Sequence, residues 1–244
     1  MKKTIYTIAT CLAMSASVSV HANELPERFK TVQHKGFSLV MDCVTRTPVL
    51  FQFRLGKDVW NEPRTDNFDF DPQLPAECQQ ASSQSYGHRK GTSYHRGHLV
   101  GANAMDNTRT TMEESFYMSN IVPQASDFNT GAWKLTEEYQ ECLREESDIL
   151  VLGGVAFNDE KNDFFMRGHQ IKTPDVFWKV IVTGEGYYAW MFANTDEMTK
   201  EVTNDYLTNI SDIEKTIGFK LNLESVSRLP GSRLPLDTSK CHLG

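Results

Sequence analysis

The side chains best suited to chemistry in this chain begin at His95-Arg96-Gly97-His98. We expect a tight turn at the glycine, because a residue without a Cβ lets the backbone turn sharply and lets a bulky anion approach. An imidazole, whose ordinary pKa is near about 6.5, can take a proton from water at neutral pH. His98 is therefore a candidate general base, with Arg96 beside it to bind an anion.

Asn129 and Glu137 add oxygen donors to this set. They lie eight residues apart, which corresponds to about 80° on an α-helix, so we expect both to face one site on one helix, with Trp133 between them. Amide and carboxylate oxygens suit Mg²⁺, which keeps several of its waters and takes few protein ligands. The structural alternative is that Asn129 caps the helix and Glu137 is a solvated surface acid.

His95 and His98 also have the spacing of a His-x-x-His zinc site. Zinc would need a third protein ligand, which His88 or a carboxylate could supply. A zinc hydrolase using His95 and His98 is therefore a second hypothesis, although we prefer an exposed loop position for His95.

Together these motifs resemble the active-site region of the DNA/RNA non-specific endonucleases, a family of ββα-metal nucleases. The family pattern is Asp-Arg-Gly-His, then Ser-Asn-x-x-Pro-Gln, then Asn-x-x-x-Trp-x-x-x-Glu. This chain matches the pattern at residues 95–98, 119–124 and 129–137, except that His95 stands where the family has an acid. The resemblance covers most of residues 37–223.

The resemblance implies a magnesium-dependent nuclease that cleaves DNA and RNA with little preference for sequence or sugar and leaves 5′-phosphate ends. Asn129 would be the direct Mg²⁺ ligand, Glu137 would hold part of the water shell of the ion, and His98 would be the general base. Mn²⁺ could substitute for Mg²⁺. The family's acid at position 95 helps to orient the loop, so we expect His95 to permit activity while changing its rate, pH optimum and metal preference.

Other side chains would assist in three ways under the same hypothesis. Some would stabilise negative charge on the phosphate, some would support the metal site from behind, and some would bind flanking phosphates. Arg96 and Arg46 would stabilise the charge on the phosphate, and Asn120 and Gln124 would support the metal site. The cations that could bind flanking phosphates are Arg54, Arg89, Lys90 and Arg109.

The charge of the chain is the main argument against this hypothesis. The formal net charge is −7, whereas proteins that bind nucleic acid without specificity normally present a basic surface. An active site needs only a local positive patch and a divalent cation, and most of the candidate cations lie in the N-terminal half. A rival from another class is a non-catalytic binding protein built on a nuclease scaffold. Loss of His98 or Asn129 would have indicated that rival, and both are present.

The N-terminus predicts export. Lys2 and Lys3 precede an apolar run over residues 5–20, and small residues before position 23 predict a signal peptide cleaved after Ala22. The run is shorter than the roughly 20 residues of a membrane-spanning helix. We therefore expect a periplasmic or secreted protein, not held in a membrane, with residues 23–244 forming one domain.

Four cysteines remain after the predicted cleavage. An even number in an exported protein predicts two disulfides, but three connectivities are open. No Cys-x-x-Cys pair occurs, so a zinc knuckle is not expected. The sequence also leaves open whether the protein forms a homodimer and whether an inhibitor protein binds it. The cysteines are Cys43, Cys78, Cys142 and Cys241.

The pattern of apolar residues predicts an α+β fold, with a central antiparallel β-sheet flanked by helices and, from the resemblance, a ββα-metal motif. A polar leader is expected over residues 23–34 and a long surface loop over residues 56–91. Strands are predicted at 37–42, 48–55, 120–123, 149–155, 176–183 and 187–192, and helices at 111–117, 131–145, 199–209 and 211–217.

Overall fold

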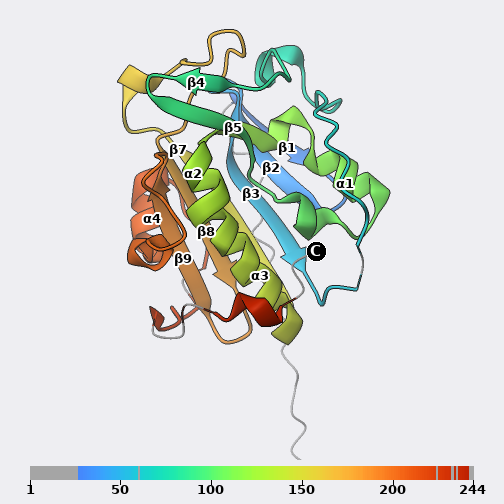
Figure 1. Ribbon diagram of the computed structural model, residues 1–244, viewed down its shortest axis with the longest axis vertical. Helices are drawn as coiled ribbons and strands as arrows, with labels where there is room; N and C mark the ends of the chain where they lie inside the picture. Colours follow the sequence, from blue (N-terminus) through green and yellow to red (C-terminus); the bar gives the residue numbers. More distant parts are fainter. Residues whose placement is uncertain (1–26, 60, 224, 232–233, 235, 242–244) are drawn as a thin grey trace, which may run out of the picture.

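The computed structural model describes residues 27–59, 61–223, 225–231, 234 and 236–241 (Figure 1). The predicted signal peptide therefore lies outside the described residues. Among the residues that are described, none of the helices is both long and apolar enough to cross a membrane.

A six-stranded sheet forms the centre of the molecule (Figure 1), and each neighbouring pair of strands in it is antiparallel. This confirms the predicted fold class and the strands predicted for this sheet. The sheet also contains a strand at residues 29–33, where a polar leader was expected; only Val32 of that strand is buried, so its sequence looks like that of a loop. In spatial order the strands are β1 (Phe29–Gln33), β2 (Phe37–Asp42), β3 (Thr47–Leu55), β7 (Ile149–Ala156), β8 (Val176–Val182) and β9 (Tyr187–Ala193).

Both faces of this sheet are covered, which explains why β7 and β8 are almost continuously apolar. On one face Val151 and Phe177 pack in the cluster that contains Trp133. On the other face Leu152 and Trp178 pack with Ile213 of α4 (Ile210–Ile217). The sheet is thus a rigid platform, and one of its faces supports the segment that carries the candidate site.

The helix predicted at residues 199–209 is wrong. Only a 3₁₀ turn at Thr203–Tyr206 forms there. Asn209 instead caps α4, because its side-chain oxygen accepts a hydrogen bond from the backbone of Asp212 at 2.9 Å. The predicted helix at 211–217 is confirmed as the body of α4, which ends at Gly218 in the left-handed conformation.

A second, three-stranded antiparallel sheet carries the His95–His98 motif. It consists of β4 (Gly87–Arg89), β5 (Thr92–His98) and β6 (Ile121–Ala125). The tight turn predicted at the motif is therefore wrong, since all four residues lie in β5. Gly97 is needed for close packing instead, because a Cβ there would collide with the side chain of Gln124.

Three helices complete this side of the molecule: α1 (Arg109–Ser115), α2 (Ser126–Phe128) and α3 (Lys134–Glu146). The predicted helix at 131–145 is confirmed only from Lys134. Before it, residues 129–133 form a wide π-type turn, and Gly131 has non-helical angles (φ −102°, ψ −107°). A Cβ at Gly131 would lie 2.9 Å from the carbonyl oxygen of Met198. The segment at Met198 therefore packs so closely against this turn that only glycine fits there.

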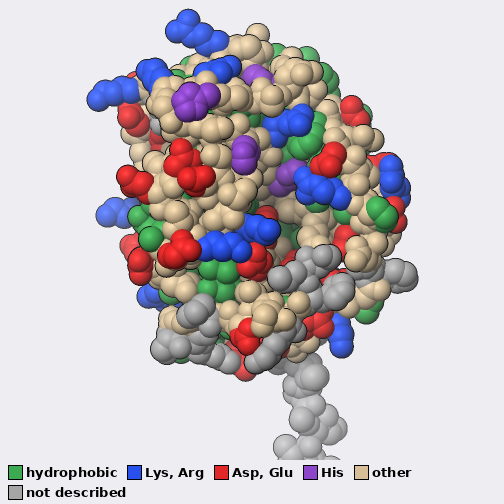
Figure 2. All heavy atoms as spheres, viewed as in Figure 1, with side chains coloured by type: hydrophobic (Ala, Val, Ile, Leu, Met, Phe, Trp, Pro, Cys, Tyr) green, Lys and Arg blue, Asp and Glu red, His purple; other side chains and the backbone are tan. Residues whose placement is uncertain are grey.

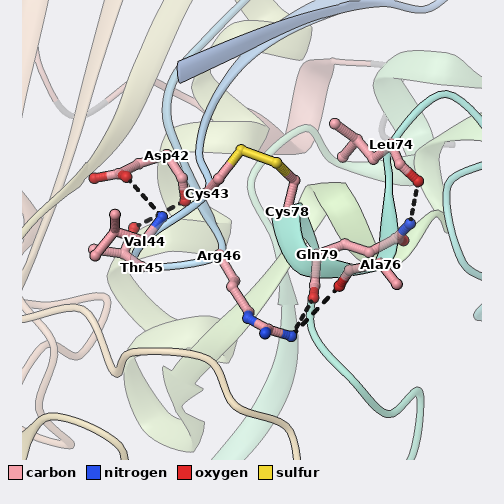
Figure 3. Close-up of a disulfide and its surroundings, with 9 residues drawn as sticks. All are labelled: Asp42, Cys43, Val44, Thr45, Arg46, Leu74, Ala76, Cys78 and Gln79. Atoms are coloured by element: carbon pink, nitrogen blue, oxygen red, sulfur yellow. Dashed lines mark hydrogen bonds between the residues drawn. A yellow bond between two sulfur atoms is a disulfide. The ribbon is translucent and has the colours of Figure 1, made fainter. Parts of the chain in front are cut away.

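Two disulfides connect the four cysteines, as predicted, and the structure selects one of the three connectivities. Cys43–Cys78 joins the β2–β3 turn to the long loop (Figure 3), and Cys142–Cys241 attaches the C-terminal segment to α3. The predicted loop at 56–91 is confirmed as far as Tyr86, apart from a 3₁₀ turn at Ala76–Cys78, and β4 follows it.

Candidate active site

His98 ends β5 in an aromatic pocket. Its ring lies 4.7 Å from the ring of Phe116, edge to face, and 5.7 Å from that of Phe68. The indole N–H of Trp133 donates to the carbonyl oxygen of His98 at 3.0 Å, which attaches the strand end to the start of α3. The Nε2 atom of His98 is buried and has no hydrogen-bond partner among the described residues. His98 is thus held rigidly with one ring nitrogen free to act.

Charge and burial keep His98 neutral. Burial lowers the pKa of His98 to about 3; Arg64 lowers it as well, Asp66 acts in the opposite direction, and Arg96 adds a smaller lowering effect. A neutral imidazole has one nitrogen that can accept a proton. The ring is therefore in the form that a general base requires.

Asn129 lies in the wide turn before α3, and its Nδ2 is 3.3 Å from Nδ1 of His95. For this hydrogen bond His95 must be neutral, with its own hydrogen on Nε2, so that Nδ1 accepts. The contact turns the amide of Asn129 so that Oδ1 is the atom that can meet a cation. The two motifs are brought together at this point.

The geometry does not support zinc chelation by His95 and His98. Side chains three residues apart in a β-strand point to opposite faces of the sheet. In addition, the described part of the chain contains no group of three or more His, Cys, Asp or Glu side chains arranged to hold a metal ion. The described residues therefore give the zinc hypothesis no support.

Glu137 lies on α3 and faces a pocket of about 220 Å³ that Arg64 and Gln140 also line. Gly101 permits this placement, since a Cβ there would lie 2.7 Å from Oε1 of Glu137. Burial raises the pKa of Glu137, and the buried ammonium group of Lys179 acts in the opposite direction. The wide turn, and not a shared helix face, sets the position of Glu137 relative to Asn129, so the one-helix argument from spacing is wrong.

Lys179 is an unusual neighbour of the site, because it is only 1% exposed in the middle of β8. Its Nζ lies 3.8 Å from the ring centroid of Trp133, a cation–π contact. Trp133 in turn holds the backbone of His98. A single buried cation thus acts electrostatically on Glu137 and packs against the residue that holds His98.

Arg64 is a site residue that the sequence did not reveal. Its guanidinium lies over the ring of Phe116 at 4.8 Å, and Nε is 2.8 Å from Oδ1 of Asp66. Its charge lowers the pKa of both His98 and Glu137. Arg64 stands in a loop without any recognisable motif, so only the folded chain brings it near His98 and Glu137.

Asn120 and Gln124 lie behind the site. The side chain of Asn120 accepts from the backbone N–H of Val100 at 2.9 Å and donates to the carbonyls of Val100 and Ser115 at 2.8 Å each. It therefore clamps the segment that follows His98. Gln124 is fully buried, and neither polar atom of its amide has a partner among the described residues.

The predicted catalytic arginines differ in their surroundings. Arg96 stacks on Phe68 at 3.6 Å and donates to the carbonyl of Ser83 at 2.8 Å, close to His98. Arg46, in the left-handed conformation at φ 60°, donates to the carbonyl of Gln79 at 3.0 Å beside the first disulfide (Figure 3). No hydrogen bond or ring contact among the described residues joins Arg46 to His98, Asn129 or Glu137.

The four cations predicted to bind flanking phosphates lie in three separate places. Arg54 is exposed on β3, whereas Arg109 pairs with Glu113 at 2.6 Å on α1. Arg89 and Lys90 lie together at the β4–β5 hairpin.

Comparisons with known proteins agree with this geometry. The model of the DNA/RNA non-specific endonuclease family matches residues 16–227. A nuclease of Serratia marcescens is 27% identical over 199 residues, which is 77% of this chain and 72% of that protein. The mitochondrial nuclease EXOG of Xenopus laevis is 26% identical over 230 residues, 86% of this chain and 63% of that protein.

Other relatives extend the same picture. A nuclease of Nostoc is 27% identical over 175 residues, 65% of this chain and 60% of that protein. The chain thus spans about three fifths of the length of several curated relatives that it matches. A solved structure described as an EndoG/EndoGI complex, reported for the mechanism of EndoG inhibition, has a similar fold. Its TM-score is 0.63 at 21% identity, over 77% of this chain and 83% of the other.

Proposed function

The chain belongs to the DNA/RNA non-specific endonuclease family, and on that premise we propose that it is a metal-dependent endonuclease that hydrolyses DNA and RNA with little preference for sequence or sugar. The observation that carries the proposal is His98, a half-buried neutral imidazole whose buried Nε2 has no hydrogen-bond partner among the described residues, next to two arginines. A non-catalytic binding protein would have no need to keep an unpaired base in this form.

The reaction is a single displacement at phosphorus. His98 Nε2 takes a proton from water as the water oxygen forms a bond to phosphorus, and the bond from phosphorus to the 3′ oxygen breaks. The leaving 3′ oxygen takes a proton from solvent water, and His98 later releases its proton to solvent, so the products are a 3′-hydroxyl and a 5′-phosphate. Because the site would contact the phosphate and not the base edges, the enzyme would not distinguish between base sequences or between DNA and RNA.

Arg64 and Arg96 bind the phosphate in this mechanism. Both act electrostatically on His98, and each guanidinium is held by an aromatic ring, Phe116 or Phe68. Charge-assisted donors held in place before the reaction stabilise the negative charge that develops on phosphorus oxygens. We assign Arg46 to holding the loop beside the disulfide, so Arg64 takes the role that the sequence predicted for Arg46.

The residues present fit a hard divalent cation. Asn129 offers Oδ1, because its Nδ2 is engaged by His95, and Glu137 offers a carboxylate. Gln124 adds a buried amide without a partner, which could hydrogen-bond to ordered water. Oxygen donors few in number suit Mg²⁺, with Mn²⁺ as a substitute. When bound, the ion would neutralise charge on the scissile phosphate and on the leaving oxygen.

We also propose that the protein works in an oxidising compartment outside the cytoplasm. Two disulfides support this, because such bonds persist mainly in exported proteins. Some relatives carry the word mitochondrial in their names, so family membership alone does not decide the compartment.

The proposed activity is tested with purified protein on supercoiled plasmid and on total RNA, with Mg²⁺, with Mn²⁺ and with EDTA. We expect both polymers to be degraded with either metal, no degradation in EDTA, and products that a ligase accepts because they end in 5′-phosphates. Absence of cleavage with any divalent metal would reject the proposal and favour the binding-protein hypothesis.

A further inference from the structure

The β4–β5 hairpin lies within an acid-free part of the chain. Residues 78–105 contain no Asp or Glu, although the whole chain holds 32 of them in 244 residues. The same stretch contains Arg89, Lys90 and Arg96. In a protein of net charge −7, this segment is therefore locally positive, and Lys and Arg side chains gather over the end of the molecule that carries the hairpin (Figure 2).

The tip of this hairpin has a backbone that disfavours lysine. Arg89 pairs with Thr92, so Lys90 and Gly91 form a two-residue turn, with φ of 46° and 90°. Two positive φ values are typical of a type I′ turn, in which Asn, Asp or Gly is preferred at the first position. A lysine held in this conformation costs stability and points to a function for its charge.

The side chains at the tip are presented to solvent. Residues 87–91 are all exposed. Nζ of Lys90 lies 4.7 Å from the ring centroid of Phe165, and the guanidinium of Arg89 donates to the carbonyl of His88 at 2.7 Å. These contacts limit the motion of both cations without neutralising their charge.

The hairpin leads directly to the catalytic base, because β5 runs from Thr92 at the tip to His98 at the site. A strand advances about 3.3 Å per residue, so the tip lies about 20 Å from His98. Duplex DNA rises about 3.4 Å per base pair, so this distance corresponds to about six base pairs.

We propose that Arg89 and Lys90 form a distal anchor for the phosphate backbone of the substrate, about six base pairs from the bond that His98 cleaves. The inference rests on the proposed nuclease function and adds to it a contact that only substrates of sufficient length can reach. The anchor would bind the negative charge of the phosphate backbone whatever the base sequence, which agrees with an active site that contacts only the backbone of the nucleic acid.

The test compares Lys90→Asn with the charge-matched control Lys215→Gln, which removes an exposed lysine of α4 from the opposite face of the main sheet. Duplexes with one defined cleavable position and arms of increasing length are digested, and KM is measured for each. For Lys90→Asn we expect KM to rise about two- to fivefold once an arm exceeds about six base pairs. The salt dependence of binding to long duplexes should weaken by about one unit of slope. Lys215→Gln should follow wild type at every length.

Thermal unfolding provides the second readout, since Asn is favoured at this turn position. Lys90→Asn should therefore unfold at the same temperature as wild type or higher, which excludes misfolding as the cause of weaker binding. The same change in KM at all arm lengths, or none, would overturn the anchor. Failure of wild type to cleave any duplex would instead overturn the nuclease proposal, so the two failures are distinguishable.

Discussion

The amide nitrogen of Asn129 lies 3.3 Å from Nδ1 of His95, so the proposed metal ligand is oriented by the residue at which this chain departs from its family. An acid at position 95 would accept the same hydrogen bond that neutral histidine accepts through Nδ1. The departure therefore preserves an acceptor and changes its charge.

This relationship predicts the behaviour of position 95. His95→Asp keeps a hydrogen-bond acceptor and should retain activity within a few-fold of wild type. His95→Leu removes the acceptor, so the amide of Asn129 loses this hydrogen bond. We expect the leucine variant to need about ten- to a hundredfold more Mg²⁺ for half-maximal rate, the usual cost of losing an outer-shell partner. Rates measured over a range of Mg²⁺ concentrations provide the test. Equal metal requirements for both variants would contradict the positioning role.

Lys179 is predicted to support catalysis and stability together. Lys179→Met removes the buried cation that faces Glu137 and contacts Trp133. Without that charge the half-buried carboxylate of Glu137 is less compensated, which costs on the order of 1 to 3 kcal/mol in the free energy of unfolding. For Lys179→Met we expect both the free energy of unfolding, measured with denaturant, and kcat/KM to fall. Lys179→Arg keeps the charge and should recover part of the stability and part of kcat/KM. A Lys179→Met protein as active and as stable as wild type would contradict this role of the Lys179 charge.

Asp106 predicts how stability changes with pH. Burial raises the pKa of Asp106 to about 6, and Asp58 raises it further than Arg144 can offset. An acid whose pKa is raised by folding destabilises the folded state at high pH; this cost grows as pH rises from about 4 to 6 and is absent below that range. Asp106→Asn should therefore increase the free energy of unfolding by about 1 to 3 kcal/mol at pH 8 and have little effect at pH 4.

The control for that measurement is Glu146→Gln, at an exposed position at the end of α3. It removes one charge without removing a buried acid, so it should change stability little at either pH. A gain for Asp106→Asn that is equal at pH 4 and pH 8 would show that the ionisation of Asp106 is not its cause.

The elements that could be predicted from sequence are those with strong local patterns. β7, β8 and β9 are runs of apolar residues bounded by turns, and the structure confirms them. β5 was mistaken for a turn because its residues are polar: it is stabilised by pairing with β6, a contact between distant parts of the chain that no local pattern reveals. The first strand escaped prediction for the same reason.

The site was predictable where a motif defines it and not where the fold assembles it. His98, Asn129 and Glu137 were chosen from their residue types and from the family pattern, and the structure brings the segments that carry them together. The turn that places Asn129 depends on the close approach of Met198 to Gly131, and Arg64 reaches the site through a loop without regular structure. Such long-range packing is a property of the folded chain and has no signal in the residues themselves.

The most direct test of the account compares His98→Ala with His88→Ala, a control that removes an exposed histidine of β4. Plasmid and RNA cleavage are measured with Mg²⁺, after thermal unfolding has shown that both variants are folded. The account predicts that His98→Ala loses about 10²- to 10⁴-fold in rate on both polymers, the usual contribution of a general base, while His88→Ala cleaves like wild type. A folded His98→Ala protein that cleaves either polymer at the wild-type rate would contradict the central claim.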